Sequence, residues 1–269
     1  MSHAGPPPIE RIGVEPALRG LDALRQYVVF YFGLLLLAIA CLGWLPFAAV
    51  LRVLLPRHLA RALGRAVIQH VWRIYFLALS ALGAARFDLS ELATLRDKPP
   101  MILAPNHPTL IDAMLIASCV PRLCCVMKSD IADNVFLGAG ARLADYIVND
   151  APKGMIKAAV DDLRRGHPLL LFPEGTRTDS PPVNPLKAGI GLVAARASVP
   201  VQTLIVEAGS PFLAKGWHIL RKPVLPLTYR VRIGRCFAPP PANPDAVRSF
   251  VTQLQDYYKA ELANDSSAG

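Results

Sequence analysis

The chain has 269 residues, enough for one catalytic domain and an accessory segment. Hydrophobic residues make up 53 % of it, a high share for a soluble enzyme, and this indicates membrane contact. The net charge of +9 suits nucleic acid, an anionic membrane surface or an acidic substrate. Nucleic acid is the weakest of the three, because the chain is so apolar and carries no nucleic-acid-reading motif. The five cysteines have no zinc-type spacing, so neither a metal site nor a disulfide framework is predicted.

The amino-terminal third of the sequence predicts a loose segment over residues 1–25 and a membrane-associated helical region over residues 26–85. No residue between Arg25 and Arg52 is charged, and this run is long enough to span a bilayer. Alternatively, a bend within the run would make a hairpin that enters one leaflet. The residues that could bend it are Gly33, Gly43 and Pro46. Arginines on both sides leave the positive-inside rule undecided.

Three arginines at Arg57, Arg61 and Arg65 recur every four residues and therefore share one helix face. Two interpretations stay open: a solvated face, or a basic stripe that rests on anionic lipid headgroups. The following apolar stretch, 66–85, predicts a helix packed on membrane or core, in which His70 is structural.

From residue 86 to 262, short apolar runs alternate with helical stretches. The expected strands are 100–104, 123–127, 146–149, 168–172, 201–206 and 227–234, and the expected helices are 108–118, 152–165 and 186–198. This alternation predicts an α/β fold with a mostly parallel sheet flanked by helices. A last helix begins at Asn243–Asp245, and residues 263–269 form a tail.

His107 and Asp112 stand where a predicted strand meets a predicted helix. Pro108 suits the first position of a helix and keeps the residue before it out of helical angles, so His107 is expected in the loop and Asp112 one turn into the helix. From there the carboxylate can reach back to one ring nitrogen and leave the other free as a base for a substrate hydroxyl. Taken alone, an ordinary loop histidine and a helix-start aspartate would also explain the pair.

A second group of polar residues, Glu174–Arg177, follows the apolar run that ends in Phe172 and Pro173. Glycine lets a backbone approach a ligand closely, and arginine offers a planar fork for phosphate or carboxylate. Loops at strand ends of an α/β sheet are common ligand sites. A plain turn with an Arg–Glu pair is the alternative.

Together the two segments resemble the motifs of the glycerolipid acyltransferases, the family of the bacterial 1-acylglycerol-3-phosphate acyltransferases. The motif Asn-His-x-x-x-x-Asp is matched by Asn106, His107 and Asp112, and Phe-Pro-Glu-Gly-Thr-Arg is matched by Phe172–Arg177. Lys187 and Gly189 match a Phe-Lys-x-Gly element in which Leu186 replaces the phenylalanine, and Val199–Val201 match the start of a fourth motif. The resemblance covers about residues 86–235.

The resemblance implies an acyltransferase domain over residues 86–262, with His107 as general base and Asp112 orienting it. It implies that the acceptor's glycerol phosphate is bound by Asn106, Glu174, Gly175, Thr176 and Arg177, with Lys187 as a further candidate for phosphate or donor. The acyl donor would be a thioester of CoA or acyl carrier protein, with no metal or other cofactor bound. Expected partners are a lysophospholipid and membrane lipid, at a bacterial inner membrane with the active site facing the cytoplasm.

One position departs from the family pattern. Asp150 stands where a second motif usually has an arginine that contacts the acceptor phosphate. A carboxylate would repel a phosphate there, unless Lys153 or Arg142 compensates or Asp150 caps the helix at Pro152. A different lipid acceptor is therefore an alternative, as are a thioester hydrolase on the same scaffold and a non-catalytic lipid-binding protein.

Overall fold

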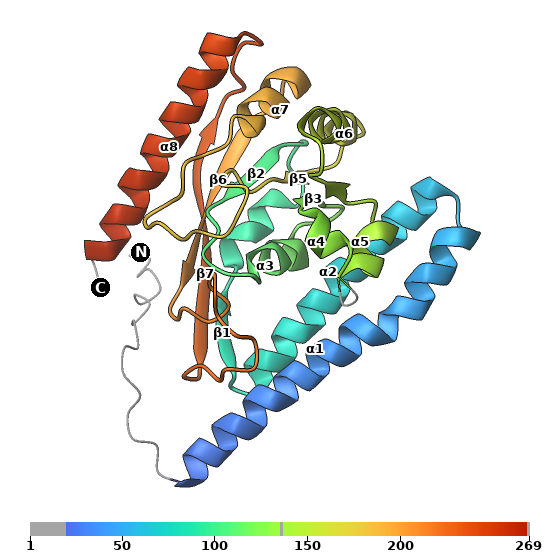
Figure 1. Cartoon of the computed structure of the whole chain (residues 1–269), viewed down its shortest axis with the longest axis vertical. Coiled ribbons are helices and arrows are strands. Elements are labelled where there is room, and N and C mark those ends of the chain that lie inside the picture. The colour runs from blue at the N-terminus through green and yellow to red at the C-terminus, as the bar shows by residue number, and fades with distance from the viewer. Residues whose placement is uncertain (1–19, 135–136, 268–269) are drawn as a thin grey trace, which may run out of the picture.

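Two long helices lie along one side of an α/β domain in the computed structural model, which describes residues 20–134 and 137–267 (Figure 1). The first, α1, spans Gly20–Leu54, and the second, α2, spans Arg57–Ala81. Of the predicted loose segment, residues 1–19 lie outside the described residues, and the remainder begins α1. The chain reverses at Pro56, so α2 runs back along α1.

The alternative of a hairpin formed by a turn inside the apolar run does not hold, because this run is one helix. Gly33, Gly43 and Pro46 all lie within the single helix α1, and a hairpin arises instead because α2 packs against α1. The close approach is visible at Gly33, where an added Cβ would lie 3.0 Å from the Leu79 side chain.

Helix α1 leaves most of its apolar surface uncovered. Of its 35 residues only Phe30, Gly33 and Ala48 are buried, although its most apolar window has a mean hydropathy of 2.5. Among the described residues it is the one helix that is long and apolar enough to cross a bilayer. The predicted apolar helix is therefore present, and its exposure is consistent with membrane association.

The sheet has seven strands in the order β1-β7-β6-β2-β5-β3-β4. Their bounds are β1 Ala85–Asp88, β2 Ile102–Pro105, β3 Cys124–Met127, β4 Ile147–Val148, β5 Leu169–Leu170, β6 Val201–Ala208 and β7 Leu227–Phe237. Every neighbouring pair is parallel except β6 and β7, which are antiparallel. The predicted mostly parallel α/β sheet is thus confirmed, and β1 is a strand that the pattern did not predict.

Helices cover both faces of this sheet, and alternate strand residues serve the two faces. Leu103 and Leu170 face a core with Trp72, Phe76 and Leu115, beneath α1, α2 and the helix α3. Ile102 and Leu169 face the opposite core, beneath α6, α7 and α8. The remaining bounds are η1 Ser90–Leu95, α3 Asp112–Cys119, α4 Ser129–Ala132, α5 Gly138–Leu143, α6 Pro152–Arg164, α7 Gly189–Ala197 and α8 Pro244–Ser267. Asn243 caps α8 as predicted, because its Oδ1 accepts from the Ala246 N–H at 2.8 Å.

Two of the three arginines in the α2 stripe, Arg61 and Arg65, neither face solvent nor are free for lipid headgroups, so both interpretations are wrong for these two. Arg65 is 3 % exposed, and its guanidinium donates to both carboxylate oxygens of Asp162 on α6, at 3.0 and 3.2 Å. Arg61 also reaches Asp162, at 3.4 Å, and only Arg57 is well exposed, paired with Asp145. Burial alone would raise the pKa of Asp162, but the hydrogen bonds and charge of Arg65 hold it below its ordinary value. The stripe therefore fastens the helical hairpin to the α/β domain.

Candidate active site

The strand order brings three loops together at one edge of the sheet. Strands β2, β5 and β3 are neighbours and run parallel, so their carboxyl ends meet at the same edge. The residues that follow these ends are His107, Glu174–Arg177 and Lys128, respectively. Ligands of open α/β sheets bind at such an edge.

His107 is held by a buried carboxylate. Its Nδ1 lies 2.8 Å from Oδ2 of Asp112, whose side chain is 0 % exposed, whereas the His107 side chain is 15 % exposed. Thr109 holds the same carboxylate: its N–H donates to Oδ2 at 2.8 Å and its hydroxyl donates to Oδ1. With Nδ1 occupied as a donor, Nε2 is left as the acceptor of the neutral ring.

The local geometry differs from the predicted one. Helix α3 begins at Asp112 itself, and Pro108 lies in the preceding loop rather than at the first helical position. The turn made by Thr109 and Asp112 explains the delay, because the carboxylate accepts the Thr109 N–H before the helix starts. Contact between the two side chains results all the same, with Asp112 in the first turn, where the helix dipole stabilises a negative charge.

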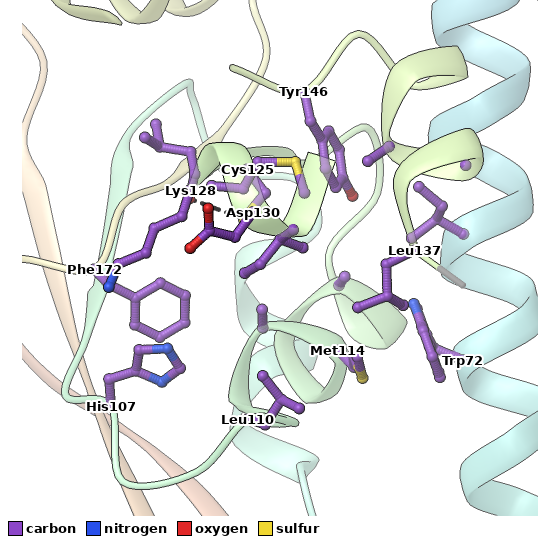
Figure 2. Close-up of a pocket in the computed structure, with 18 of the residues that line it drawn as sticks. Trp72, His107, Leu110, Met114, Cys125, Lys128, Asp130, Leu137, Tyr146 and Phe172 are labelled. Atoms are coloured by element: carbon purple, nitrogen blue, oxygen red, sulfur yellow. Dashed lines mark hydrogen bonds between the residues drawn. The ribbon is translucent and has the colours of Figure 1, made fainter. Parts of the chain in front are cut away.

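The ring of Phe172 packs on one face of the His107 imidazole. Its ring stacks on that of His107 with centroids 3.9 Å apart and an interplanar angle of 26°. Figure 2 shows the two rings side by side at one end of a pocket. Asp112 thus holds the His107 ring at its Nδ1 edge and Phe172 holds it on one face, which is the arrangement that a positioned base requires.

Glu174 lies behind the pocket rather than in it. It is 1 % exposed and accepts hydrogen bonds from the His107 N–H (2.9 Å), the Asn184 N–H (2.9 Å) and the Thr178 hydroxyl (2.8 Å). Burial raises its pKa, and these donors oppose the rise. The geometry does not place Glu174 where a substrate hydroxyl could bond to it; it ties the His107 loop to the loop after β5.

Asn106 is also part of the scaffold. It is 4 % exposed, its Oδ1 accepts from the Val206 N–H at 2.7 Å, and its Nδ2 donates to the Val206 carbonyl at 3.0 Å. The side chain therefore continues the pairing of β2 with β6 after β2 has ended. The predicted substrate contact of Asn106 is not among its bonds in the structure.

Three of the four other predicted binding residues line the pocket: Gly175, Thr176 and Arg177. Gly175 has φ of +69°, which favours glycine. Arg177 donates through Nη1 to the carbonyls of Leu213 (2.9 Å) and Ala214 (3.1 Å). The fourth, Lys187, is exposed outside the pocket, with its stem covering Gly175.

The pocket has a volume of about 490 Å³, within the usual range for small-ligand sites. It runs from His107 and Phe172 past Leu110 and Met114 to Trp72 and Leu137 (Figure 2). Its apolar wall comes from α1, α2 and α3 and includes Ala40, Trp44, Val67, Ile68, Val71, Ala113 and Ala117. Its polar part is formed by Lys128, Asp130, Asn149, Thr176, Arg177 and Lys215.

Several of these residues escaped the sequence analysis. Lys128 donates from Nζ to the Thr176 hydroxyl at 3.2 Å and so stands beside the predicted binding loop. Its position directly after a predicted strand was the available signal. Thr109 occupies one of the unspecified positions of the Asn-His-x-x-x-x-Asp motif, and its hydrogen bond to Asp112 depends on a turn that the sequence did not predict. No local sequence pattern could indicate that α1 and α2 contribute residues to the pocket wall, because this depends on where the hairpin packs on the domain.

Asp150 does not line the pocket, although its neighbour Asn149 does. It is exposed, and its Oδ1 accepts from the Ala151 N–H at 2.7 Å. The N-cap of α6 is Ala151, so Asp150 does not cap that helix. Arg142 donates to the Ala132 carbonyl, and neither it nor Lys153 lines the pocket.

Comparison with known proteins agrees with this geometry. Residues 86–207 match the family model described as Acyltransferase. A 1-acyl-sn-glycerol-3-phosphate acyltransferase of Pseudomonas aeruginosa is 25 % identical over 252 residues, covering 91 % of this chain and 93 % of that protein. A lyso-ornithine lipid O-acyltransferase of Rhodobacter capsulatus is 38 % identical over 86 residues, 30 % of this chain and 31 % of that protein.

The fold has a solved counterpart. The crystal structure of the 1-acyl-sn-glycerophosphate (LPA) acyltransferase from Thermotoga maritima superposes with a TM-score of 0.65 at 20 % sequence identity, covering 92 % of this chain and 97 % of that one. The residues matched by the family model include both motifs, and the Pseudomonas aeruginosa relative extends over nearly the whole chain. The matched domain and these relatives therefore support a glycerolipid acyltransferase family for this chain.

Proposed function

We propose that the chain transfers a fatty acyl group from a CoA or acyl-carrier-protein thioester to the hydroxyl of a lysophospholipid of the 1-acylglycerol-3-phosphate type. The observation that carries this proposal is the His107–Asp112 pair at the end of a largely apolar pocket. A base whose outer nitrogen faces a chain-sized apolar pocket suits a lipid alcohol as its substrate.

In the proposed reaction, Nε2 of His107 takes the proton of the acceptor hydroxyl as its oxygen attacks the thioester carbonyl. Asp112 stabilises the resulting imidazolium, which its bond to Nδ1 already orients. When the tetrahedral intermediate collapses, the carbon–sulfur bond breaks and the imidazolium proton goes to the leaving thiolate. The products are the diacylated lipid and the free thiol of the carrier.

The polar part of the pocket is proposed to hold the acceptor's anionic head. Lys128 and Arg177 supply two cations, and Thr176 supplies a hydroxyl that Lys128 already contacts. An arginine fork and a lysine ammonium are both suited to phosphate oxygens. The apolar remainder, from Met114 to Trp72, is proposed to take an acyl chain.

We further propose that residues 26–85 associate with the membrane and residues 86–262 form the catalytic domain. The uncovered apolar surface of α1 supports this division, and it would place the pocket beside the bilayer that holds a lysolipid. Because activated acyl thioesters are made in the cytoplasm, the active site is proposed to face that side of a bacterial inner membrane.

A second candidate acceptor is a lysolipid with a zwitterionic amino-acid head. Asp130 lines the pocket with Lys128 and Arg177, so the rim presents both charges. Asp150 follows the pocket residue Asn149 at the position where the family pattern has an arginine, and one relative is a lyso-ornithine lipid O-acyltransferase. A head with an ammonium and a carboxylate would complement such a rim better than a phosphate monoester would.

The test is acyl transfer by purified protein, given a labelled acyl thioester and a panel of lysolipids that includes lysophosphatidic acid and lyso-ornithine lipid. His107→Ala should abolish transfer. His70→Ala is the matched control, because His70 is exposed on α2 and bonds only its own helix, at the Ala66 carbonyl. Label that appears only as free fatty acid would indicate a hydrolase, and full activity of His107→Ala would refute the mechanism.

A further inference from the structure

The segment between β6 and β7, residues 209–226, has an unusual composition. It contains Lys215, Arg221, Lys222 and His218 and no aspartate or glutamate. We call it the β6–β7 loop. Its charge therefore complements an anionic surface and lacks the carboxylates that such a surface would repel.

The tip of this loop carries exposed aliphatic side chains. Ile219 is 43 % exposed and Leu220 is 55 % exposed. Among the residues that the structure describes, every other large apolar side chain with comparable exposure lies on α1 or α2. In the described part of the chain, large apolar side chains with this exposure are thus confined to the hairpin and this loop, which is not the scatter seen on an ordinary soluble surface.

The loop tip also touches α1. Tyr31 donates from its hydroxyl to the Leu220 carbonyl at 3.4 Å, and Lys222 Nζ donates to Gln26 Oε1 at 3.2 Å. Lys222 lies 5.2 Å from the centroid of the Tyr27 ring. Figure 1 shows the loop beside the amino-terminal half of α1. The two exposed apolar surfaces are therefore continuous.

The base of the loop reaches the active site. The Leu213 carbonyl accepts from the Leu110 N–H at 3.1 Å and from Arg177, and the Ala214 carbonyl also accepts from Arg177. Lys215, the next residue, lines the pocket. One short segment thus joins an exposed apolar tip to Arg177 of the proposed acceptor site and to Lys215, which lines the pocket.

We propose that the β6–β7 loop is a second membrane-contact element beside the helical hairpin, and that this loop docks on an anionic bilayer. Ile219 and Leu220 enter the interface, Arg221 and Lys222 lie among the headgroups, and Trp217 sits at the interfacial level with the Arg221 guanidinium 4.7 Å from its ring centroid. The docked loop presents the pocket mouth to lipid. The inference rests on the proposed function only in taking the acceptor from a bilayer.

The direct test reads the position of Trp217, one of three tryptophans. Full-length protein with Trp44→Phe and Trp72→Phe is reconstituted into vesicles of phosphatidylcholine and phosphatidylglycerol, with or without brominated acyl chains. We expect Trp217 emission to shift to the blue and to be quenched by bromines placed near the carbonyls. Unshifted, unquenched emission from vesicle-bound protein would overturn the proposal. If the double variant does not fold, the difference between wild type and Trp217→Phe gives the same reading.

A second measurement separates docking from packing. Ile219→Ser/Leu220→Ser should lower kcat/KM about tenfold or more for an acceptor in anionic vesicles, the loss expected when two aliphatic side chains no longer enter lipid. It should leave kcat/KM for a monomeric short-chain acceptor within about twofold of the wild-type value. Arg221→Glu should act in the same direction, whereas Lys259→Glu on α8 is the matched charge control.

Equal losses on both acceptors would refute membrane docking and assign the loop a packing role toward Arg177. A protein partner that shifts Trp217 emission to the blue in the absence of lipid would also refute it. Failure of the acyltransferase assay itself would leave the quenching result intact, so the two proposals fail separately.

Discussion

Replacement of Glu174 by glutamine tests whether this residue binds substrate or holds the His107 loop. The Glu174 oxygens accept from the His107 N–H, the Asn184 N–H and the Thr178 hydroxyl, which reaches both oxygens at 2.8 Å. A glutamine has only one acceptor oxygen. In either orientation its amide nitrogen would face a backbone N–H, of His107 or of Asn184.

The expected cost follows from these bonds. A hydrogen bond to a charged group contributes about 1.5–3 kcal/mol, and a buried donor without a partner costs about 1–3 kcal/mol. Burial raises the pKa of Glu174, which means that desolvation of the charged carboxylate lowers the stability of the folded protein. A neutral glutamine would not carry this cost. We therefore expect a net loss of about 2–4 kcal/mol. For a chain of this size that is a melting temperature lower by roughly 4–12 °C.

The assay combines thermal unfolding with steady-state kinetics of acyl transfer. A lower melting temperature with a lower kcat and a nearly unchanged acceptor KM would support a positioning role. The control is Glu207→Gln, which breaks a partly exposed pair with Arg232 and should cost within about 1 kcal/mol. An unchanged melting temperature with a raised acceptor KM would refute the reasoning and restore Glu174 as a binding residue.

Four further changes have defined outcomes. Asp112→Asn should lower kcat by about 10²–10⁴, because an amide does not hold the imidazole in the required tautomer, and steady-state kinetics would show it. Lys128→Met should raise KM about tenfold for an anionic acceptor but not for a neutral monoacylglycerol, when both are compared at low salt. Met114→Phe should shift preference toward shorter acyl thioesters in a chain-length series, because it narrows the apolar pocket. Asp162→Asn should lower the melting temperature at neutral pH. Because Arg65 holds the folded pKa of this carboxyl below its ordinary value, the pair's contribution is fully present above the unfolded-state pKa of about 4 and is lost as the pH falls from there through the folded pKa, so melting temperatures of the variant should depend less on pH in acid.

Local patterns in the sequence were sufficient for much of the fold. Alternation of strand-length and helix-length apolar runs predicted the α/β class, because periodicity reports which residues face a core. The contact of His107 with Asp112 was also within reach, since the two are five residues apart and a proline lies between them. Their catalytic roles, and those of the binding loop, remain predictions.

Tertiary structure decided where the other polar side chains point. Arg65 and Asp162 are 97 residues apart, and Glu174 and the His107 N–H are 67 apart, so no spacing rule could pair them. Only the strand order, with β5 between β2 and β3, sets Glu174 behind His107 and Lys128 beside Thr176. The apolar pocket likewise exists only because the hairpin docks on α3. Spacing along the chain determines a residue's face; the partner on that face depends on how distant segments pack.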